Sequence, residues 1–386
     1  MNDVEDLRSD QPPLSFENVP ESSGELQKRI QIEEIISNSI NQNISLEVLK
    51  KLAISSFGLV NDKLRRILWP CLAGVDASSL ERVPTLNAFQ NHHEYNQVVL
   101  DVNRSLKRFP PGIPYEQRIA LQDQLTVLIL RVIKKYPNLR YYQGYHDVAV
   151  TFLLVAGEEV AYAIMDKLST THFSECMQET MEATQKRLMF IWPVVKFENA
   201  DLYEFLQASS VGTLFSLPWY LTWFGHSLNS YKTVVRLYDY FLASPIYTPI
   251  FLTAAILLHR SKEILKEDCD MAAVHCLLSR LPDDLPFEDL IKASTKLYAK
   301  YSLTLLENEV EILMHQEENR LMEEKMLLER RKKITRPVIK PRNFEIKRWL
   351  PNLLTSKSVV LTTAVSIVVG VCAYYYKNQY LAAGIS

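Results

Sequence analysis

The chain has 386 residues and a formal charge of −2 at pH 7, so its charge balance does not indicate nucleic-acid binding, which favours a strongly basic protein. Its 10 glycines are never closer than 13 positions, which excludes a P-loop, a dinucleotide-binding fingerprint and a nucleophile elbow, since each needs two glycines within about five residues. Scarce glycine and the lack of Asn-Gly and Asp-Gly pairs also argue against tight β-hairpins and predict an all-α protein.

Residues 1–44 are the first predicted region. Positions 1–29 are mildly acidic, contain three prolines and lack an apolar period, so we expect an acidic and largely disordered tail with no secretory signal. The first clear helix has Ser45 as its N-cap and ends at Gly58. This helix opens a folded domain that we place at residues 45–300.

The segment Glu94–Phe109 has two kinds of side chain at helical spacing. Apolar residues at steps of three and four predict a buried face, which comprises Val99, Val102, Leu106 and Phe109. Polar residues at the same steps predict a second face, which comprises Glu94, Gln97, Asp101, Arg104 and Arg108. Because Asp101 and Arg104 lie one turn apart, they can form an ion pair. Taken alone, this helix favours an ordinary surface pair worth about 0–1 kcal/mol.

A long amphipathic helix over residues 119–133 is predicted next, and it ends before Pro137. The loop that follows contains the run Arg140-Tyr-Tyr-Gln-Gly-Tyr-His-Asp. A glutamine within such an aromatic run is held in place and partly desolvated, and the Gln143 amide can donate to and accept from one water molecule. In isolation, the loop favours the simpler interpretation, in which Gln143 binds local backbone and the tyrosines fill the core.

Three more helical segments follow. Residues 147–156 and 250–258 are predicted to be short buried helices. Together with residues 247–251 the second could be interpreted as a membrane span, but Pro245 and Pro249 break the stretch, and its unbroken apolar part is much shorter than the ~20 residues that a span needs. Residues 303–329 begin with apolar residues at heptad spacing and then become highly charged, which predicts a charged helical spacer over residues 301–333.

The C-terminal region predicts a single transmembrane helix. Residues 359–376 contain no charged side chain and end in three tyrosines, and they would form a helix of about 27 Å, close to the ~30 Å of a hydrocarbon core. Residues 334–358 form a basic juxtamembrane linker, so the positive-inside rule places residues 1–358 in the cytosol and leaves residues 377–386 as a short lumenal tail. A buried C-terminal helix is the alternative, but this stretch has no amphipathic face.

This arrangement predicts a tail-anchored, single-pass protein of the endoplasmic reticulum membrane, since a span of this length suits a thinner bilayer. The Golgi and the nuclear envelope stay open as locations. The basic linker is also compatible with nuclear import or nucleic-acid binding. Next to a membrane span, we interpret it as a contact with anionic lipid headgroups and expect the lipid bilayer, not nucleic acid, as its partner.

Neither a metal nor a cofactor is indicated. The five cysteines are odd in number and lack a C-x-x-C motif, which suits a reducing compartment. His93 and the glutamate after it resemble the start of a zinc-protease motif, but Gln97 stands where the second histidine is required. Cys269, His275 and Cys276 have no fourth ligand nearby, so we interpret them as structural.

Two of these segments together resemble the site motifs of the TBC-domain Rab GTPase-activating proteins. Val98-x-x-Asp101-x-x-Arg104 resembles the IxxDxxR motif of that family, and Tyr142-Gln143-Gly144 resembles its YQG motif. Val98 replaces the usual isoleucine, a change that conserves volume. The two residues after Gly144 are Tyr-His, where many relatives have Met-Asn, and this difference could alter which GTPase is accepted.

Two further motifs extend the resemblance over residues 55–300. Leu64–Trp69 resembles the opening of the family's domain, and Pro218–Phe224 with Arg236–Asp239 resembles its later helical signature. Four matches in the same order are more specific than any single motif.

The resemblance implies a multi-helix domain that stimulates GTP hydrolysis by a Rab GTPase and has no stand-alone catalytic activity. Arg104 would act as an arginine finger, Gln143 would orient the attacking water, Asp101 would hold the guanidinium, and Tyr142 and Gly144 would support the loop. GTP and Mg²⁺ would be carried by the partner. With the C-terminal span, the resemblance implies a Rab-one-type partner in traffic from the endoplasmic reticulum to the Golgi. The alternative is a membrane-tethered module that binds a Rab, or serves as a scaffold, without catalysis.

Overall fold

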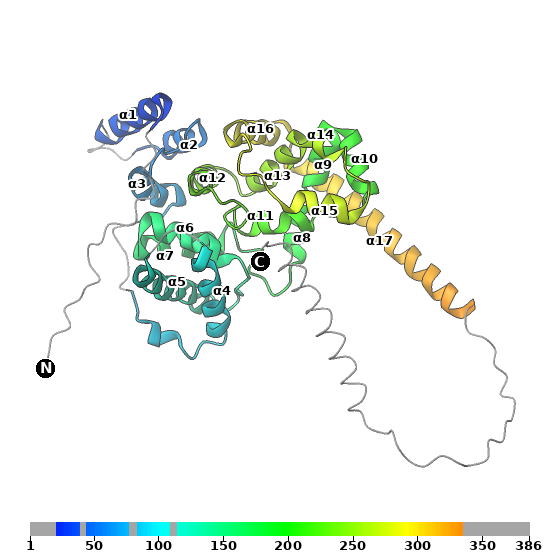
Figure 1. Cartoon of the computed structure of the whole chain (residues 1–386), viewed down its shortest axis with the longest axis horizontal. Coiled ribbons are helices and arrows are strands. Elements are labelled where there is room, and N and C mark those ends of the chain that lie inside the picture. The colour runs from blue at the N-terminus through cyan, green and yellow to red at the C-terminus, as the bar shows by residue number, and fades with distance from the viewer. Residues whose placement is uncertain (1–20, 39–43, 77–82, 109–113, 335–386) are drawn as a thin grey trace, which may run out of the picture. The chain divides into compact units, whose positions relative to one another are not determined.

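The computed structural model describes residues 21–38, 44–76, 83–108 and 114–334, and within these ranges every regular element is a helix (Figure 1). The all-α prediction is therefore confirmed for the described residues. The α-helices in chain order are α1 (Ser23–Asn38), α2 (Leu46–Ile54), α3 (Asp62–Ala73), α4 (Tyr95–Arg108), α5 (Tyr115–Lys135), α6 (Tyr145–Ala156), α7 (Glu158–Thr170), α8 (Glu182–Leu188), α9 (Ile191–Glu198), α10 (Ala200–Ala208), α11 (Leu217–Leu221), α12 (Tyr231–Ala243), α13 (Thr248–His259), α14 (Ser261–Ile264), α15 (Met271–Ser279), α16 (Phe287–Lys300) and α17 (Leu303–Ile334). Two short 3-10 helices are η2 (Leu86–Phe89) and η3 (Leu214–Ser216).

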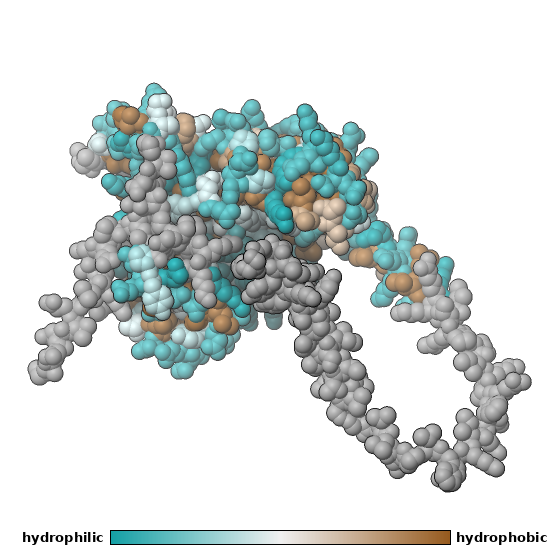
Figure 2. All heavy atoms as spheres, viewed as in Figure 1, coloured by the Kyte–Doolittle hydropathy of each residue, from teal (hydrophilic) through white to brown (hydrophobic). Residues whose placement is uncertain are grey.

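The chain divides into two compact units, residues 1–320 and residues 321–386. The first unit contains α1 to α16 and the first part of α17, and the described part of the second unit is the rest of α17. The charged stretch 303–329 is thus helical, as its sequence predicts. Hydrophilic residues cover most of the visible face of the first unit, and hydrophobic residues are seen only in patches between them (Figure 2).

Helices α4 to α7 form one group within the first unit (Figure 1). Helix α4 packs on α5, α5 on α7, and α6 on α7. All twelve residues of α6 are buried, which confirms the short buried helix predicted at 147–156. The helix predicted at 119–133 is α5, which begins four residues earlier and ends at Lys135, just before Pro137. The site loop therefore connects an amphipathic helix to a fully buried one.

A second group surrounds α13, which packs against both α9 and α16. Residues Thr248–Leu257 of α13 are all buried, so the core interpretation of the apolar stretch at 250–258 is confirmed. Its Pro249 lies in the first turn, where proline is compatible with a helix. Among the helices that the structure describes, none combines the length and the hydrophobicity needed to cross a membrane. The predicted span at 359–376, the linker that precedes it and the tail 377–386 lie outside the described residues.

The prediction of a disordered tail over 1–44 is wrong for the residues that form α1. Ile32 on this helix is fully buried, and Glu25 is 7% exposed and forms an ion pair of 2.5 Å with Lys232 of α12. On the same helix, Lys28 donates to Ser55 Oγ at 2.6 Å. The local composition does not reveal these contacts, because they come from residues elsewhere in the chain. They stabilise a helix that its own sequence favours only weakly. The remainder of the predicted tail lies outside the described residues, apart from a few residues beside α1 and α2.

The start of the second helix is predicted correctly and its end is not. Ser45 is the N-cap residue of α2, although its side chain makes no capping hydrogen bond, and the helix ends at Ile54. Gly58 lies in the turn that follows, with φ of 54°, and a Cβ atom there would lie 2.5 Å from Asp239 Oδ2. Glycine is required at this position both by the left-handed backbone and by the close approach of the carboxylate.

Asp239 on α12 is the centre of a buried polar cluster that joins α2, α3 and α12. Arg65 Nε lies 3.1 Å from Asp239 Oδ1, and Trp69 Nε1 donates to the same oxygen at 2.7 Å. The backbone N–H of Leu59 donates to Asp239 Oδ2 at 3.0 Å. Asp239 is 0% exposed and Arg65 is 2% exposed. Two of the four recognised motifs, the opening motif and the later signature, therefore meet here and have a structural role.

Candidate functional site

Helix α4 positions the first two site residues, but with a different buried face from the predicted one. Val98 and Val102 are both 0% exposed, whereas Val99 is half-buried. Asp101, predicted on the polar face, is only 2% exposed. Asp101 faces the loop before α6 instead of solvent. Its carboxylate can be buried there because the loop supplies a hydrogen-bond donor to it. The side chains of Leu106, Arg108 and Phe109 lie outside the described residues.

Two neutral donors hold the buried carboxylate of Asp101. Gln97 Nε2 donates to Asp101 Oδ2 at 3.0 Å, and the hydroxyl of Tyr141 donates to the same oxygen at 3.1 Å. Arg104 Nη1 lies 3.7 Å from Asp101 Oδ1, beyond hydrogen-bond distance, and the Arg104 side chain is 71% exposed. The carboxylate is thus fixed, whereas the guanidinium is paired with it only loosely and extends into solvent.

Tyr141 supports the site, and the sequence reasoning missed it in favour of Tyr142. The hydroxyl of Tyr142 donates to the carbonyl of Leu221 at 2.8 Å, so this residue connects the loop to α11 and not to Asp101. Tyr141 bonds Asp101 with its hydroxyl, and its N–H donates to Glu94 Oε2 at 3.1 Å. The sequence does not distinguish two adjacent tyrosines. Only the course of the loop backbone determines which hydroxyl reaches Asp101 and which reaches Leu221.

The hydroxyl proton of Tyr141 fixes the tautomer of His146. Burial raises the pKa of Tyr141 well above its ordinary value, and the charge of Asp101 raises it further, so the phenol stays protonated. Its one proton goes to the Asp101 carboxylate. His146 Nδ1 lies 2.8 Å from the same hydroxyl, so we infer that this nitrogen has a hydrogen and donates it.

Gln143 is exposed on the loop, and its side-chain amide makes no hydrogen bond to the residues that the structure describes. The expectation that Gln143 is partly desolvated is therefore wrong, and so is the part of the simpler interpretation in which Gln143 binds local backbone. The other part is confirmed, because the neighbouring tyrosines Tyr141, Tyr142 and Tyr145 pack in or against the core. Gly144 follows with φ of 109°, and a Cβ atom there would lie 2.9 Å from Thr222 Cγ2. The left-handed backbone and the close approach both require glycine. Gly144 thus lets the chain turn into α6 and leaves the Gln143 side chain on the outside.

The buried carboxylate of Asp147, in the first turn of α6, joins α4 to the helix that follows the loop. Ser105 Oγ donates to Asp147 Oδ1 at 2.8 Å, and His226 Nδ1 lies 2.8 Å from Asp147 Oδ2. Burial raises the pKa of Asp147, but the hydrogen bond from His226 and the charge of His146 outweigh it, and the pKa lies below its ordinary value. The carboxylate is therefore ionised at neutral pH. Sequence reasoning did not single out Ser105 or His226, because no local pattern connects residues 79 positions apart.

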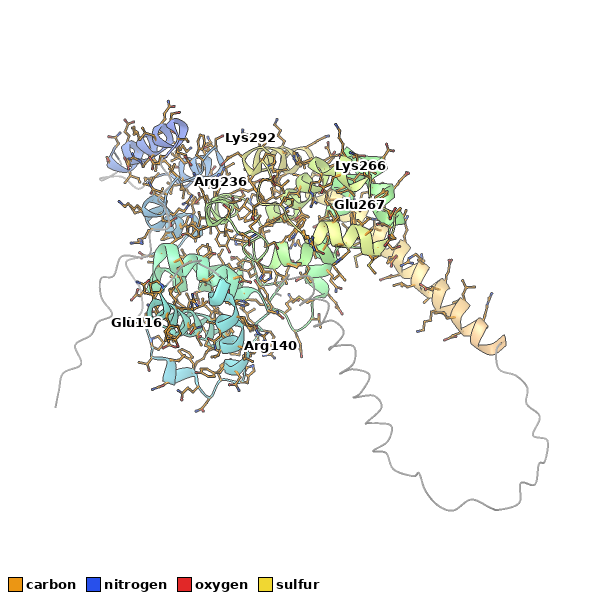
Figure 3. The ribbon with its side chains drawn as sticks, viewed as in Figure 1. Glu116, Arg140, Arg236, Lys266, Glu267 and Lys292 are labelled. Atoms are coloured by element: carbon orange, nitrogen blue, oxygen red, sulfur yellow. The ribbon has the colours of Figure 1, made fainter. Side chains whose placement is uncertain are left out.

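The two site segments are thus brought side by side. One hydrogen bond joins Asp101 on α4 to Tyr141, and a second joins Ser105 on α4 to Asp147. Figure 3 agrees, since it shows Arg140, at the start of the loop, beside α4. Two exposed polar side chains, Arg104 and Gln143, belong to these two clamped elements. The structure thereby presents a planar cation and an amide to solvent from a rigid, buried base.

The predicted absence of a metal site stays a prediction. Among the described residues, no group of three or more His, Cys, Asp or Glu side chains could hold a metal ion. His275 Nδ1 lies 3.0 Å from Ser279 Oγ, and Cys269 Sγ lies 3.7 Å from the carbonyl of Phe205. These contacts are local and fit the structural interpretation of both residues.

Comparison with known families identifies this helical domain. The Rab-GTPase-TBC domain model matches residues 62–265, more than half of the chain. The chain belongs to this family, and the resemblance inferred from its motifs is confirmed.

The chain is also similar to individual proteins over about two-thirds of its length. The chain is 47% identical to human TBC1 domain family member 20 over 66% of its own length and 63% of that protein. It is 44% identical to the cattle protein of the same name over 71% of its length and 68% of the relative's. The fission yeast GTPase-activating protein gyp10 is 30% identical over 65% of this chain and 68% of the yeast protein. The matches thus span about two-thirds of each relative, and slightly less in the human protein.

A solved structure supports the fold. The crystal structure of the Ypt/Rab-GAP domain of Gyp1p matches with a TM-score of 0.56 and covers 71% of this chain and 98% of that domain. At 17% sequence identity, this match supports the fold alone.

Proposed function

We propose that this protein is a GTPase-activating protein for a Rab GTPase, and that it inserts Arg104 and Gln143 into the partner's nucleotide site. The observation that carries the proposal is the clamped pair of elements described above, from which an arginine and a glutamine extend into solvent. The protein's membership of the Rab-GTPase-TBC family supports the same activity. The partner brings GTP and Mg²⁺, and this chain brings two side chains.

Arg104 would stabilise the charge that develops on the transferred phosphoryl group. Its guanidinium is planar and presents several N–H donors, which suits the oxygens between and around the β- and γ-phosphates. Asp101 limits the directions in which the guanidinium can extend, and Gln97 and Tyr141 hold that carboxylate in turn. The entropy of ordering the finger is thereby reduced before the partner arrives.

Gln143 would position the attacking water, in place of a glutamine of the partner. Its amide can accept a hydrogen bond from the water through its carbonyl oxygen and donate one to a phosphate oxygen at the same time. Gly144 and Tyr142 hold the loop that supports it, since the first allows the sharp turn and the second ties the loop to α11.

The activity is tested with a panel of purified GTP-loaded Rab GTPases and the full-length chain. We expect strong stimulation of at least one of them, with a Rab-one-type GTPase preferred. Gln143→Ala should lower kcat for stimulated hydrolysis about a hundredfold or more, because a misplaced water loses its in-line geometry. Gln143→Glu is a matched control that keeps the side-chain length and removes the amide donor. An unchanged rate in both variants would mean that the partner positions the water itself. It would favour the alternative, in which this protein binds a Rab without taking part in catalysis.

We also propose that residues 359–376 anchor the protein in the endoplasmic reticulum membrane with residues 1–358 in the cytosol. The sequence supports this proposal, because ten basic residues and one acidic residue lie between Arg330 and Lys357 and one basic residue follows the apolar stretch. Such a segment would hold the GTPase-activating domain on the membrane where its partner resides.

Deletion of residues 359–386 should release the protein from membranes and leave its activity on a soluble GTP-loaded Rab unchanged. Carbonate extraction of microsomes measures the attachment to the membrane, protease protection measures the topology, and a hydrolysis assay with soluble GTP-loaded Rab measures the activity. The full-length chain should resist extraction, and external protease should digest residues 1–358. A protected domain, or a deletion variant that stays in the membrane pellet, would contradict the proposed topology.

A further inference from the structure

A surface cavity of about 510 Å³ lies next to the candidate site, between η3 and α11 on one side and the end of α15 on the other. Its apolar wall includes Leu214 and Trp219, and Leu214 is 61% exposed although it is a large hydrophobic residue. Its polar side includes His226, His275 and Arg280. The cavity therefore combines an accessible apolar surface with basic groups.

The ionisable residues that line this cavity are all basic, since its lining contains no aspartate or glutamate. Arg280 is exposed and makes no ion pair with the described residues. The carboxylate of Asp283 lies just outside this lining, where it accepts two hydrogen bonds at 2.8 Å each from Asn229, a residue of the lining. Asn229 thus engages this carboxylate, and Arg280 keeps its guanidinium for a group that enters the cavity. The cavity thus suits a group that carries a negative charge beside an apolar one.

Hydrogen bonds connect this cavity to the clamped site. His226 forms one edge of the cavity, and its Nδ1 lies 2.8 Å from Asp147, which also binds Ser105 on α4. Thr222, four residues earlier, is the residue that a Cβ atom at Gly144 would meet, and its hydroxyl accepts from the N–H of His226 at 3.1 Å. The cavity therefore adjoins the loop that presents Gln143.

We infer that this cavity is a docking subsite for the partner GTPase, and that it takes a surface segment of the partner in which an acidic side chain lies next to an apolar one. This inference rests on the proposed function, because the partner is the GTPase whose nucleotide faces Arg104 and Gln143. Arg280 attracts the acidic side chain and Leu214 covers the apolar one. Such a contact sets which GTPase is accepted without taking part in the reaction.

The test compares Arg280→Glu and Leu214→Asp with the wild type, each as the full-length chain. Both residues are exposed, so neither change disturbs the core. Lys266→Glu is the matched control, since it reverses an exposed charge on the segment between α14 and α15, and Figure 3 shows it well away from Arg140. Two quantities are measured with GTP-loaded Rab: the Kd for binding, and kcat and KM for stimulated hydrolysis.

We expect both cavity variants to raise Kd and KM about tenfold with kcat unchanged, because a reversed charge repels the acidic group and the buried apolar contact is lost. The control should keep the wild-type values. Replacement of one acidic surface residue of the Rab by lysine should restore the affinity of Arg280→Glu and weaken that of the wild type.

Other outcomes separate the two hypotheses. Wild-type binding without stimulated hydrolysis would overturn the proposed catalytic function, and the Kd values would still decide whether the cavity is a docking subsite. Unchanged Kd in both cavity variants, with normal stimulation, would overturn the docking inference alone. A lower KM in Arg280→Glu would also overturn it, because it would assign the cavity to the acidic residues 1–20 of this chain.

Discussion

Arg104→Ala should lower the stimulated rate of GTP hydrolysis by about 10³- to 10⁵-fold, or about 4–7 kcal/mol of activation free energy. The variant should keep the helical circular-dichroism spectrum, because the Arg104 side chain is 71% exposed and its ion pair with Asp101 spans 3.7 Å. The guanidinium is exposed and the buried carboxylate keeps its donors Gln97 and Tyr141, so loss of this loose pair should cost only about 0–1 kcal/mol of stability. The large effect on rate and the small effect on stability together distinguish a finger from a surface salt bridge.

Arg104→Lys is the sharper variant, because it keeps the charge and removes the planar fork. A single ammonium cannot contact two phosphoryl oxygens at once, so we expect a loss in kcat nearly as large as that for alanine. Single-turnover hydrolysis at saturating Rab, with binding measured separately, gives the two values. If the lysine variant stimulated hydrolysis almost fully, Arg104 would not be the finger.

Tyr141→Phe provides a graded test of the support beneath the finger. The change removes one of two neutral donors to Asp101 and leaves that carboxylate with Gln97. We expect kcat to fall by much less than in Arg104→Ala, with affinity for GTP-loaded Rab unchanged. Tyr142→Phe is the comparison variant, since it removes the bond between the loop and the backbone of Leu221 and leaves Asp101 with both of its donors.

Helix identity could be predicted from the sequence wherever a segment buries a continuous face. The wholly apolar residues of α6 and α13 and the period of α5 define helices because the hydrophobic pattern and the tertiary burial agree. Helix α1 could not be predicted in this way. Its burial depends on contacts with Ser55 and Lys232, which local composition does not reveal.

The candidate site residues also fall into those that the sequence indicates and those that only the structure shows. Arg104 and Gln143 are candidates because the motifs around them resemble those of the family, and a motif specifies residue types at fixed positions. The supporting residues Tyr141 and His226 were missed, because their roles follow from which way a loop turns and from a contact across 79 positions. The burial of Asp101 was missed for a related reason, since periodicity alone assigns a charged residue to the solvent face.

Asp239→Ala should destabilise the folded domain by about 3–5 kcal/mol, because it leaves the buried guanidinium of Arg65 without its principal counter-ion. Burial alone would lower the pKa of Arg65, but the charges of Asp239 and Asp62 raise it above its ordinary value. Asp239→Ala removes the larger of these two contributions, but a guanidinium is not deprotonated in proteins, so Arg65 stays charged in the variant. Trp69 Nε1 and the N–H of Leu59 also lose their acceptor. Each unsatisfied buried donor adds to the cost.

The measurement is denaturant unfolding of the full-length chain followed by the fluorescence of its five tryptophans, one of which is Trp69. Asp62→Ala is the matched control, since it removes the other carboxylate beside Arg65 and leaves the pair with Asp239 intact, so its effect should be about 1 kcal/mol. Asp239→Asn should lie between the two, because it keeps an acceptor and removes the charge. A loss below about 1 kcal/mol for Asp239→Ala would mean that water replaces the carboxylate, and that the opening motif and the later signature are not held together by this buried ion pair.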